Sequence, residues 1–407
     1  MTASHTVVII GGGAAGIATA ASLLKRRPAL DIAIIEPSEM HSYQPGWTMV
    51  GAGIFEPEVT RRTMASVMPK GVRWIRSAAR SLEPDDNQVT LEDGSVVRYQ
   101  ILVVTPGLRL AWEKIAGLEE TLGRNGVTSN YRYDLAPYTW ELVQKLKSGR
   151  AIFSQPPMPI KCAGAPQKAM YLSCDHWLRS GVLGGIEVEF CNAGGVLFGV
   201  ADYVPALMDY VEKYEIDLKL GNNLVAVDGP AKTAVFKTDA GEVTRDFDML
   251  HVVPPQVAPQ FVADSPLAAE SGFTDVEQHT LQHVRYPDVF GLGDAGSMPN
   301  AKTAAAARKQ APVAAVNILQ QLDGKGPAAG YDGYGSCPLT VERGKIVLAE
   351  FSYGGTLAPS FPRWLIDGTK PQRLSWLLKT EVLPWLYWNG MLKGREWLAG
   401  PGGLIAA

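Results

Sequence analysis

The stretch VVIIGGGAAGIATAASLLK, residues 7–25, decides the fold. A short apolar strand leads into a glycine loop, and a run with helical spacing follows. Gly11, Gly13 and Gly16 satisfy the pattern G-x-G-x-x-G. The first glycine permits the tight turn, the second lets the backbone approach a pyrophosphate, and the third lets the helix pack closely on the strand. The helix N-terminus would offer free N–H groups to phosphates, so the stretch predicts a dinucleotide site.

An acidic residue follows this unit where a ribose would need one. Residues 31–35 form a second apolar strand, and Glu36 ends it 25 residues after Gly11. A carboxylate in that place can accept hydrogen bonds from ribose hydroxyl groups. The alternative is a glycine-rich turn without a ligand. The sequence of strand, helix, strand and terminal acid favours the dinucleotide site.

Two later segments favour FAD as that dinucleotide. The apolar strand 101–104 runs into Thr105, Pro106 and Gly107, which resembles a short turn of flavoprotein reductases. The segment VFGLGDAG, residues 289–296, resembles their second flavin motif, in which Gly293 precedes an acid, Asp294, that would bond the ribitol or the pyrophosphate. These resemblances extend to about residue 322 and indicate the superfamily with two dinucleotide-binding domains.

Composition sets the outer bounds. At 407 residues, two or three domains are expected, and 46% hydrophobic residues suffice for a sizeable core. A net charge of −3 gives no general attraction to nucleic acid, and no nucleic-acid partner is expected. Four cysteines are too few for a secreted disulfide scaffold, so we expect a reducing compartment. We see no secretion signal and no apolar run of about 18 residues that could span a bilayer.

We therefore expect an α/β fold with two Rossmann-like domains and a C-terminal amphipathic helical segment. Residues 1–110 and 275–325 are predicted to form the FAD-binding domain. Residues 111–274 are predicted to form the second Rossmann-like domain, and residues 326–407 the C-terminal segment. The expected elements of the later regions are strands near 151–153, 186–190 and 288–292, and helices near 136–146, after 166, at 204–214 and at 303–322.

The second domain lacks the features of a nicotinamide site. After strand 151–153 the chain reads SQPPMP, residues 154–159, in place of a glycine loop. The next strand ends at Cys191 and Asn192 rather than at an acid. These departures argue against NAD(P)H as a tightly specified substrate.

Two of the four cysteines are candidates for redox chemistry. Cys162 lies just before a predicted helix with Pro166 in its first turn, and Lys161 and the helix dipole are both expected to lower the thiol pKa. Cys337 lies in YDGYGSCPLT, residues 331–340, which predicts an accessible turn. Burial as a small apolar residue is the alternative for both. For Cys174 and Cys191 that packing role is favoured.

The motifs around these cysteines resemble those of a known family. The segments IKCAGAPQK (160–168), YDGYGSCPL (331–339) and LPWLYWNGML (383–392) are similar to sulfide:quinone oxidoreductases, and the similarity runs nearly the whole chain. The chain is most similar to the subfamily with two redox cysteines. The third cysteine of other subfamilies is absent, since no cysteine precedes Cys162.

The resemblance implies a cofactor, substrates and residue roles. Cys162 and Cys337 would form a redox-active disulfide, or a sulfur-bridged form of it, over FAD. Cys162 would be the thiolate that adds to the flavin ring, and Cys337 would receive the sulfide sulfur as a persulfide. A small acceptor (sulfite, a thiol or sulfide) would remove that sulfur, and a quinone would take the electrons. The implied FAD contacts, besides the glycines above, are Ala14, Ala15, Glu36, Gln44, Ala79, Asp294, Lys302, Thr303, Ala304 and Ala305.

The tail suggests how the protein reaches a quinone dissolved in the bilayer. Between residues 361 and 398, tryptophans and leucines alternate with lysines and arginines. Pro384 is expected to divide this run into two short amphipathic helices at the membrane interface. Packing on the protein's own core or on a partner subunit is the alternative. We expect a peripheral, monotopic membrane protein at the cytoplasmic face, with a homo-oligomer left open.

Three other functions stay open from the sequence. A single-subunit NADH:quinone dehydrogenase would share the flavin fold and the tail, but it would need a nicotinamide loop. The flavin subunit of a sulfide-oxidising flavocytochrome would need a secretion signal and a haem partner. A non-catalytic flavin-binding interaction protein would use the tail as a docking surface. No metal is expected, because His279 and His283 lie on an extended segment that separates their rings.

Overall fold

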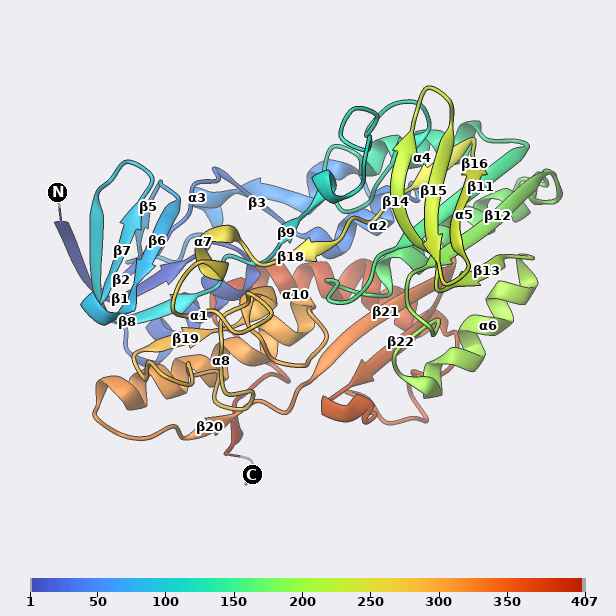
Figure 1. Ribbon diagram of the computed structural model, residues 1–407. Coiled ribbons are helices and arrows are strands. Elements are labelled where there is room, and N and C mark those ends of the chain that lie inside the picture. Colours follow the sequence, from blue (N-terminus) through green and yellow to red (C-terminus); the bar gives the residue numbers. More distant parts are fainter. Residues whose placement is uncertain (1, 405–407) are drawn as a thin grey trace.

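Two sheets lie side by side, the N-terminal one at the left of Figure 1 and the second at the right. The structure is a computed structural model that describes residues 2–404. Both sheets consist mainly of parallel strands with helices packed on them, so the predicted α/β class is confirmed.

The first sheet has the strand order β5-β2-β1-β8-β7-β6, and β19 pairs with β8. Its parallel strands carry their apolar residues in register, with Val7 opposite Ile32 and Ile101. Because the carboxyl ends of parallel strands meet at one edge, the loops that begin at Gly11, Glu36 and Thr105 gather there. The strands are β1 (Thr2–Ile10), β2 (Ile32–Ile35), β5 (Arg73–Ile75), β6 (Ala79–Glu83), β7 (Gln88–Leu91), β8 (Val96–Val104) and β19 (Val289–Gly291).

Helices α1 (Ala14–Arg26) and α8 (Ala304–Leu322) pack on this sheet and on each other. Small residues such as Ala18, Ala20 and Ala311 are buried at their shared core, which allows the close approach. Thr303 caps α8, since its hydroxyl oxygen accepts a hydrogen bond from the N–H of Ala306 at 3.1 Å. The predicted strand–loop–helix–strand unit and the alanine-rich helix are therefore both confirmed.

The second sheet has the order β10-β17-β11-β12-β13 and is wholly parallel. A separate antiparallel sheet of three strands projects beside it (Figure 1), and the sequence reasoning did not anticipate it. The strands are β10 (Val127–Thr128), β11 (Gly149–Gln155), β12 (Ile186–Asn192), β13 (Asp217–Leu220) and β17 (Met249–His251), with β14 (Asn223–Asp228), β15 (Thr233–Thr238) and β16 (Gly241–Asp246) in the projecting sheet. The helices are α4 (Ala136–Lys145), α5 (Ala165–Arg179) and α6 (Val204–Lys213).

A long C-terminal hairpin joins the core of this second half. Strands β21 (Gly335–Glu342) and β22 (Lys345–Phe351) pair antiparallel, and β21 packs along α5. Leu339 and Val341 of β21 are fully buried among residues of α5 such as Met170. This packing brings the chain after residue 335 back to the start of α5.

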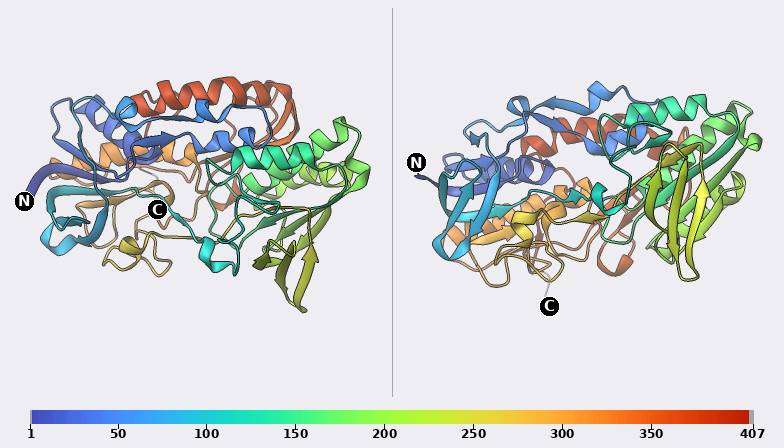
Figure 2. Two further views of the ribbon diagram at one scale, coloured as in Figure 1. Left: turned by 90° about the horizontal axis from the view of Figure 1, so that it is seen from above. Right: turned by 45° about the horizontal axis from the view of Figure 1, so that its top comes forward.

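The tail forms one helical rod rather than two helices. It comprises α9 (Arg373–Leu377), a π-helical segment (Leu378–Val382) and α10 (Leu383–Asn389), and Figure 2 shows it in red along the N-terminal region. The expectation that Pro384 would break the run is wrong. The wider π-turn directly before Pro384 accommodates the proline ring and its missing N–H without ending the helix.

Candidate active site at the cysteine pair

The structure brings two cysteines together from opposite halves of the chain. The Sγ atom of Cys162 lies 3.4 Å from the Sγ atom of Cys337, a contact between two unbonded thiols. Cys337 lies within β21 and has only 2% of its surface exposed, so the expected accessible turn is wrong. Pro338 is tolerated in this strand because β21 pairs with β22 alone and an edge strand needs fewer N–H donors.

The loop before α5 holds Cys162 in an unusual conformation. Its φ of 50° lies in the left-handed region, which residues other than glycine rarely adopt. Main-chain bonds fix it there, since its N–H donates to the carbonyl of Lys302 at 2.8 Å and its carbonyl accepts from the N–H of Ala165 at 2.7 Å. A Cβ at Gly164 would lie 2.6 Å from the sulfur of Cys337, so only glycine lets this loop approach β21.

A buried lysine on α5 stabilises the charged form of Cys162. The ammonium of Lys168 donates to the Sγ of Cys162 at 3.1 Å, and Lys168 is only 3% exposed. The hydrogen bond from the Cys337 thiol and then the charge of Lys168 hold the pKa of Cys162 well below its usual value. The same hydrogen bond and burial raise the pKa of Cys337. Within the pair, negative charge is therefore favoured on Cys162 over Cys337.

Lys161 does not contact the thiol directly. Its ammonium donates to the side-chain oxygen of Gln44 and interacts with the charge of Cys162 only through space. It lies 5.7 Å from the ring centroid of Trp47 and 5.6 Å from that of Tyr131. The cation that contacts the Cys162 thiolate is Lys168, six residues further along the chain.

A second unexpected lysine reaches the site from the tail helix. Lys379 is 2% exposed, and its ammonium donates to the carbonyl of Pro45 at 2.9 Å. Burial, then repulsion from Lys168, lowers its pKa to about 7, against the attraction of the two cysteines. The only sequence signal for this residue is its place on the inner face of an amphipathic helix.

The glycine loop has the geometry that its pattern requires. Gly11 has φ of 98°, and a Cβ there would lie 2.4 Å from the carbonyl oxygen of Thr105. A Cβ at Gly16 would lie 1.9 Å from the carbonyl oxygen of Gly11, whereas one at Gly13 would meet nothing within 4 Å. The first and third positions thus need glycine for close packing, and the second leaves open space where a phosphate could approach.

Polar groups beside this loop fit a dinucleotide. The Glu36 carboxylate accepts from the N–H of Gly12 at 2.7 Å and holds the loop in place. Within the described chain no side chain caps α1, so the N–H groups of Ala14 and Ala15 at its first turn stay available to an anion. Gly107 has φ of 76° and open space on its Cβ side.

The segment around Asp294 lies at the same edge of the first sheet. The N–H of Gly293 donates to Gln310 at 2.8 Å, which orients the turn. Burial raises the pKa of Asp294, opposed by the charges of Lys161 and Lys302. Burial also lowers the pKa of Lys302 to about 8, and its ammonium donates to the carbonyl oxygens of Asp294 at 2.9 Å and Gly296 at 2.7 Å.

The remaining implied FAD contacts lie on three different elements. Gln44 begins a short turn that precedes α2 (Trp47–Val50), and Ala79 begins β6, where it pairs with Leu91. Ala304 and Ala305 form the first turn of α8, directly after its cap. The geometry of the glycine loop, the uncapped N-terminus of α1 and the half-buried carboxylate of Asp294 together match the requirements of FAD.

The other two cysteines are packing residues. Cys174 lies on α5 and Cys191 on β12, and both are fully buried. Burial raises the pKa of Cys174 and raises that of Cys191 to about 12, so neither forms a thiolate near neutral pH. Their sequence interpretation is confirmed.

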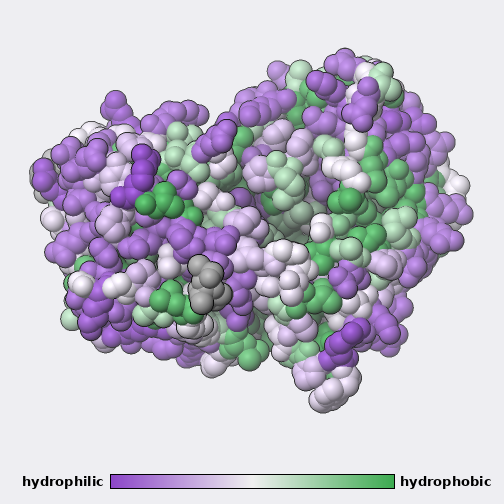
Figure 3. Space-filling view, turned by 60° about the horizontal axis from the view of Figure 1, so that its bottom comes forward, coloured by the Kyte–Doolittle hydropathy of each residue, from purple (hydrophilic) through white to green (hydrophobic). Residues whose placement is uncertain are grey.

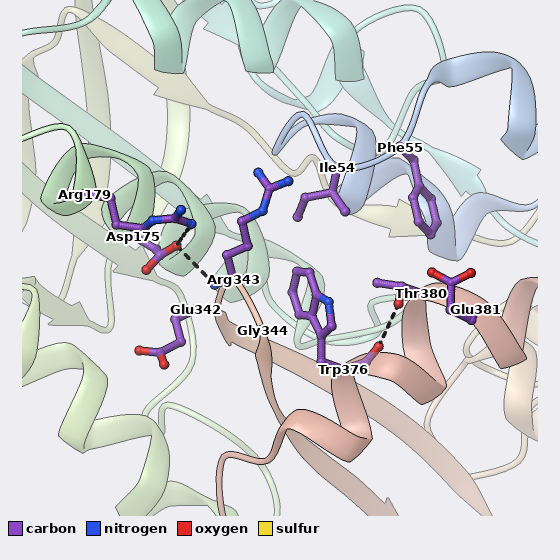
Figure 4. A pocket seen from close by; sticks show the side chains of 10 residues that line it. All are labelled: Ile54, Phe55, Asp175, Arg179, Glu342, Arg343, Gly344, Trp376, Thr380 and Glu381. Carbon is purple, nitrogen blue, oxygen red and sulfur yellow. Dashed lines mark hydrogen bonds and ion pairs between the residues drawn. The ribbon is translucent and has the colours of Figure 1, made fainter.

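A surface hollow of about 550 Å³ is present whose lining does not include the two cysteines (Figure 4). The end of α5, the β21–β22 turn and the tail helix each form part of its wall. Asp175 accepts from the N–H of Arg343 at 3.1 Å and ties the first two walls together. Trp376 forms the tail wall, three residues before Lys379.

The fold defines a class of protein, the oxidoreductases with FAD- and NAD(P)-type dinucleotide-binding folds, and in this chain two cysteines are in contact between the two sheets. No family model matches the chain. The chain is 42% identical to a mitochondrial sulfide:quinone oxidoreductase of Dictyostelium discoideum over 393 residues, which are 96% of this chain and 86% of that protein. It is 39% identical to the mouse protein of the same name, over 96% and 87% of the two chains. The chain belongs to the sulfide:quinone oxidoreductase family.

Solved structures agree on the fold. The sulfide:quinone oxidoreductase of Aquifex aeolicus superposes with a TM-score of 0.80 at 20% identity, over 96% of this chain and 92% of that one. The architecture of the two sheets is therefore that of this enzyme.

Proposed function

We propose that the protein oxidises sulfide to a persulfide at Cys162 and Cys337 and passes the electrons through FAD to a quinone. The observation that carries this function is the 3.4 Å contact between the two sulfur atoms, with the Lys168 ammonium 3.1 Å from one of them. Two thiols in contact can form a disulfide, and a thiolate that is stabilised in advance is a good leaving group when the disulfide is attacked.

The sulfur chemistry begins from the oxidised pair, in which a bond joins Cys162 and Cys337. Hydrosulfide attacks the Sγ of Cys337, a new sulfur–sulfur bond forms there, and the bond to Cys162 breaks. Cys162 leaves as a thiolate, and Cys337 carries a persulfide. The charge that the nucleophile brings is thus moved to Cys162, where Lys168 already donates a hydrogen bond.

The persulfide sulfur then leaves on an acceptor. An acceptor thiolate, sulfite or a second hydrosulfide attacks the outer sulfur, and the bond to Cys337 breaks. Cys337 leaves as a thiolate and takes up a proton, because its pKa is raised beside Cys162. The pair is then a thiolate at Cys162 and a thiol at Cys337, and it has two electrons more than the disulfide. A form in which one extra sulfur atom bridges the two cysteines also fits, because their separation exceeds a direct sulfur–sulfur bond of about 2.05 Å.

FAD, when bound, supplies the two-electron acceptor that restores the disulfide and the donor that reduces the quinone. The residues that would hold it are those of the glycine loop, the first turn of α1, and Glu36, Asp294 and Lys302, whose surroundings are described above. Lys168 keeps Cys162 in the thiolate form that electron donation requires.

The tail offers a surface that suits a membrane interface. No helix in residues 2–404 is long and apolar enough to cross a bilayer. On the tail rod, Leu377 is 54% exposed and Trp385 52%, while Tyr387 and Trp388 are buried in the first core. The rod thus packs one face on the protein's own core, which was the alternative to membrane attachment. It also presents apolar side chains to solvent on its other face.

Salt bridges hold this surface in place. Glu396 accepts from the two terminal guanidinium nitrogens of Arg26, at 2.5 and 2.9 Å, and from the Ser22 hydroxyl at 2.7 Å. This clamp fixes the end of the tail to α1, and the ring of Trp397 stacks on that of Trp385 at 5.7 Å. Tryptophans at the edge of an apolar stripe suit peripheral attachment. The face of the molecule shown in Figure 3 is, by contrast with this apolar stripe, largely hydrophilic at the left of the view.

We assign the attached protein to the cytoplasmic face, because a reducing compartment suits the free thiols of Cys174 and Cys191. An NADH:quinone dehydrogenase is disfavoured. The start of α5, where a nicotinamide loop would lie, is occupied by the Cys162 loop with its bonds to Lys302.

One assay tests the function. The purified protein with FAD is mixed with a short-chain quinone, and sulfide or NADH is added. We expect quinone reduction with sulfide and none above background with NADH. Reduction by NADH but not by sulfide would overturn the proposal.

A further inference from the structure

Lys161 is a half-buried cation for which the sulfur chemistry has no use. Its ammonium donates to the amide oxygen of Gln44 and lies between the rings of Trp47 and Tyr131. Aromatic faces attract a cation, and an amide oxygen accepts a hydrogen bond from it, so three groups hold the ammonium in one place. Holding a long lysine side chain in one conformation costs conformational entropy, and no direct contact with the neighbouring thiolate offsets that cost.

The backbone of Lys161 is held as firmly as its side chain. Its N–H donates to the side-chain oxygen of Gln256 at 2.7 Å, and its carbonyl accepts from the Tyr131 hydroxyl at 3.0 Å. The segment also pairs with Lys302 as a short parallel bridge. Lys161 therefore connects the region of the second sheet directly to the loop before α8, which packs on the first sheet.

Three groups expected to contact FAD surround this residue. Gln44 bonds its ammonium, Lys302 pairs with its backbone, and the carboxylate of Asp294 acts on its charge through space. Burial lowers the pKa of Lys161, and the negative charges of Asp294 and Cys162 counteract that effect. The site thus combines two cations, Lys161 and Lys302, with one carboxylate.

We propose that Lys161 is a further residue of the flavin site, and that its fixed positive charge raises the reduction potential of the bound FAD. The inference rests on the proposed FAD binding. Two-electron reduction leaves negative charge on the flavin ring, and a cation that is already in place stabilises this reduced form more than the neutral oxidised form. Because Lys161 and Cys162 are consecutive, one loop supplies both the electron-donating thiolate and the charge that favours its electron transfer.

The reduction potential of bound FAD tests this proposal without sulfide or quinone. The holoprotein is titrated against a redox dye as wild type, Lys161→Met, Lys161→Arg and Lys147→Met. Lys147 is exposed and serves as a matched control. At a fixed solution potential, we expect the ratio of reduced to oxidised flavin in Lys161→Met to be at least about tenfold lower than in wild type. This ratio corresponds to a reduction potential that is lower by about 30 mV. Lys161→Arg and Lys147→Met should stay close to wild type.

The outcomes separate this inference from the proposed function. An unchanged potential in Lys161→Met would overturn the inference, and a lower melting temperature with an unchanged potential would show a purely structural clasp. If Lys161→Met does not fold, Gln44→Glu takes its place, because it puts a carboxylate beside the ammonium and should also lower the potential. An unchanged potential in Gln44→Glu would overturn the inference in the same way. A wild-type protein that binds no FAD would refute both proposals, whereas normal sulfide oxidation with an unchanged potential refutes this one alone.

Discussion

The Sγ atoms of Cys162 and Cys337 lie 3.4 Å apart, although 175 positions separate the two residues in the chain. The contact exists because β21 packs along α5 and because Gly164 has no side chain to keep the two segments apart. The proposed chemistry depends on this one relationship, and the predictions below follow from it and from the groups around it.

Replacing Cys337 should stop sulfide oxidation and leave the cofactor in place. Cys337→Ser removes the sulfur that receives sulfide, while the glycine loop and Asp294 lie on other elements. We expect loss of sulfide-dependent quinone reduction by at least about a thousandfold, since no disulfide can form. Cys174→Ala is the matched control, because Cys174 is a buried packing residue of α5. Wild-type turnover in Cys337→Ser would contradict the persulfide role.

Removing the Lys168 charge should shift the pH dependence of sulfide oxidation to higher pH. Without the cation 3.1 Å from its sulfur, the pKa of Cys162 rises, so the thiolate forms only at higher pH. For Lys168→Met we expect sulfide oxidation at neutral pH to fall about tenfold for each unit by which that pKa rises above the assay pH, and to recover on the alkaline side. Lys168→Arg should restore part of the activity, and Lys237→Met at an exposed position should not differ from wild type. A uniform loss across pH would contradict the electrostatic role.

Lys379 should make the fold more stable as the pH rises. Burial lowers its pKa to about 7 in the folded protein, from the model-compound value of 10.5. Between these two values the unfolded chain binds a proton that the folded protein lacks, so the free energy of unfolding rises with pH by up to about 1.4 kcal/mol per unit. Urea unfolding at pH 7 to 10 should show a slope that is steeper in wild type than in Lys379→Met. Equal slopes would contradict the burial of this charge.

The exposed face of the tail should control membrane attachment but not sulfur chemistry. The double variant Leu377→Ser, Trp385→Ser removes two half-exposed apolar side chains from the rod. We expect at least about tenfold weaker binding to phospholipid vesicles, with unchanged reduction of a water-soluble quinone. Val243→Ser, an exposed apolar residue on β16, is the control. Unaltered vesicle binding in the double variant would place the membrane contact elsewhere.

Local chemistry made much of the fold predictable. The three glycines of the N-terminal loop have steric roles that their spacing implies, since two of them contact backbone oxygens and one faces open space. Pro166 marked the first turn of α5, as its missing N–H suits that position. These features depend on residues close in sequence, and such patterns are visible without a structure.

The electrostatics of the site depended on directions that the sequence does not show. Lys161 precedes Cys162, but the left-handed φ of Cys162 turns consecutive side chains apart, and Lys168 from the next turns of α5 reaches the thiolate instead. In the sequence, Lys379 cannot be told from the exposed lysines of an amphipathic tail. In the structure it is buried, because the rod packs on the protein. The expected helix break at Pro384 failed because a π-turn is set by packing and has no sequence signature of comparable strength.

The most direct measurement is the place where sulfide sulfur becomes bound. The oxidised protein is treated with one equivalent of isotopically labelled sulfide and no other acceptor, so that no second hydrosulfide removes the bound sulfur. The thiols are then alkylated, and the masses of the peptides are measured by mass spectrometry. We predict one labelled sulfur on the peptide that contains Cys337 and an unlabelled, alkylated Cys162. Label on Cys162 instead, or on neither cysteine, would contradict the central claim that sulfide attacks Cys337 and that Cys162 is the leaving thiolate.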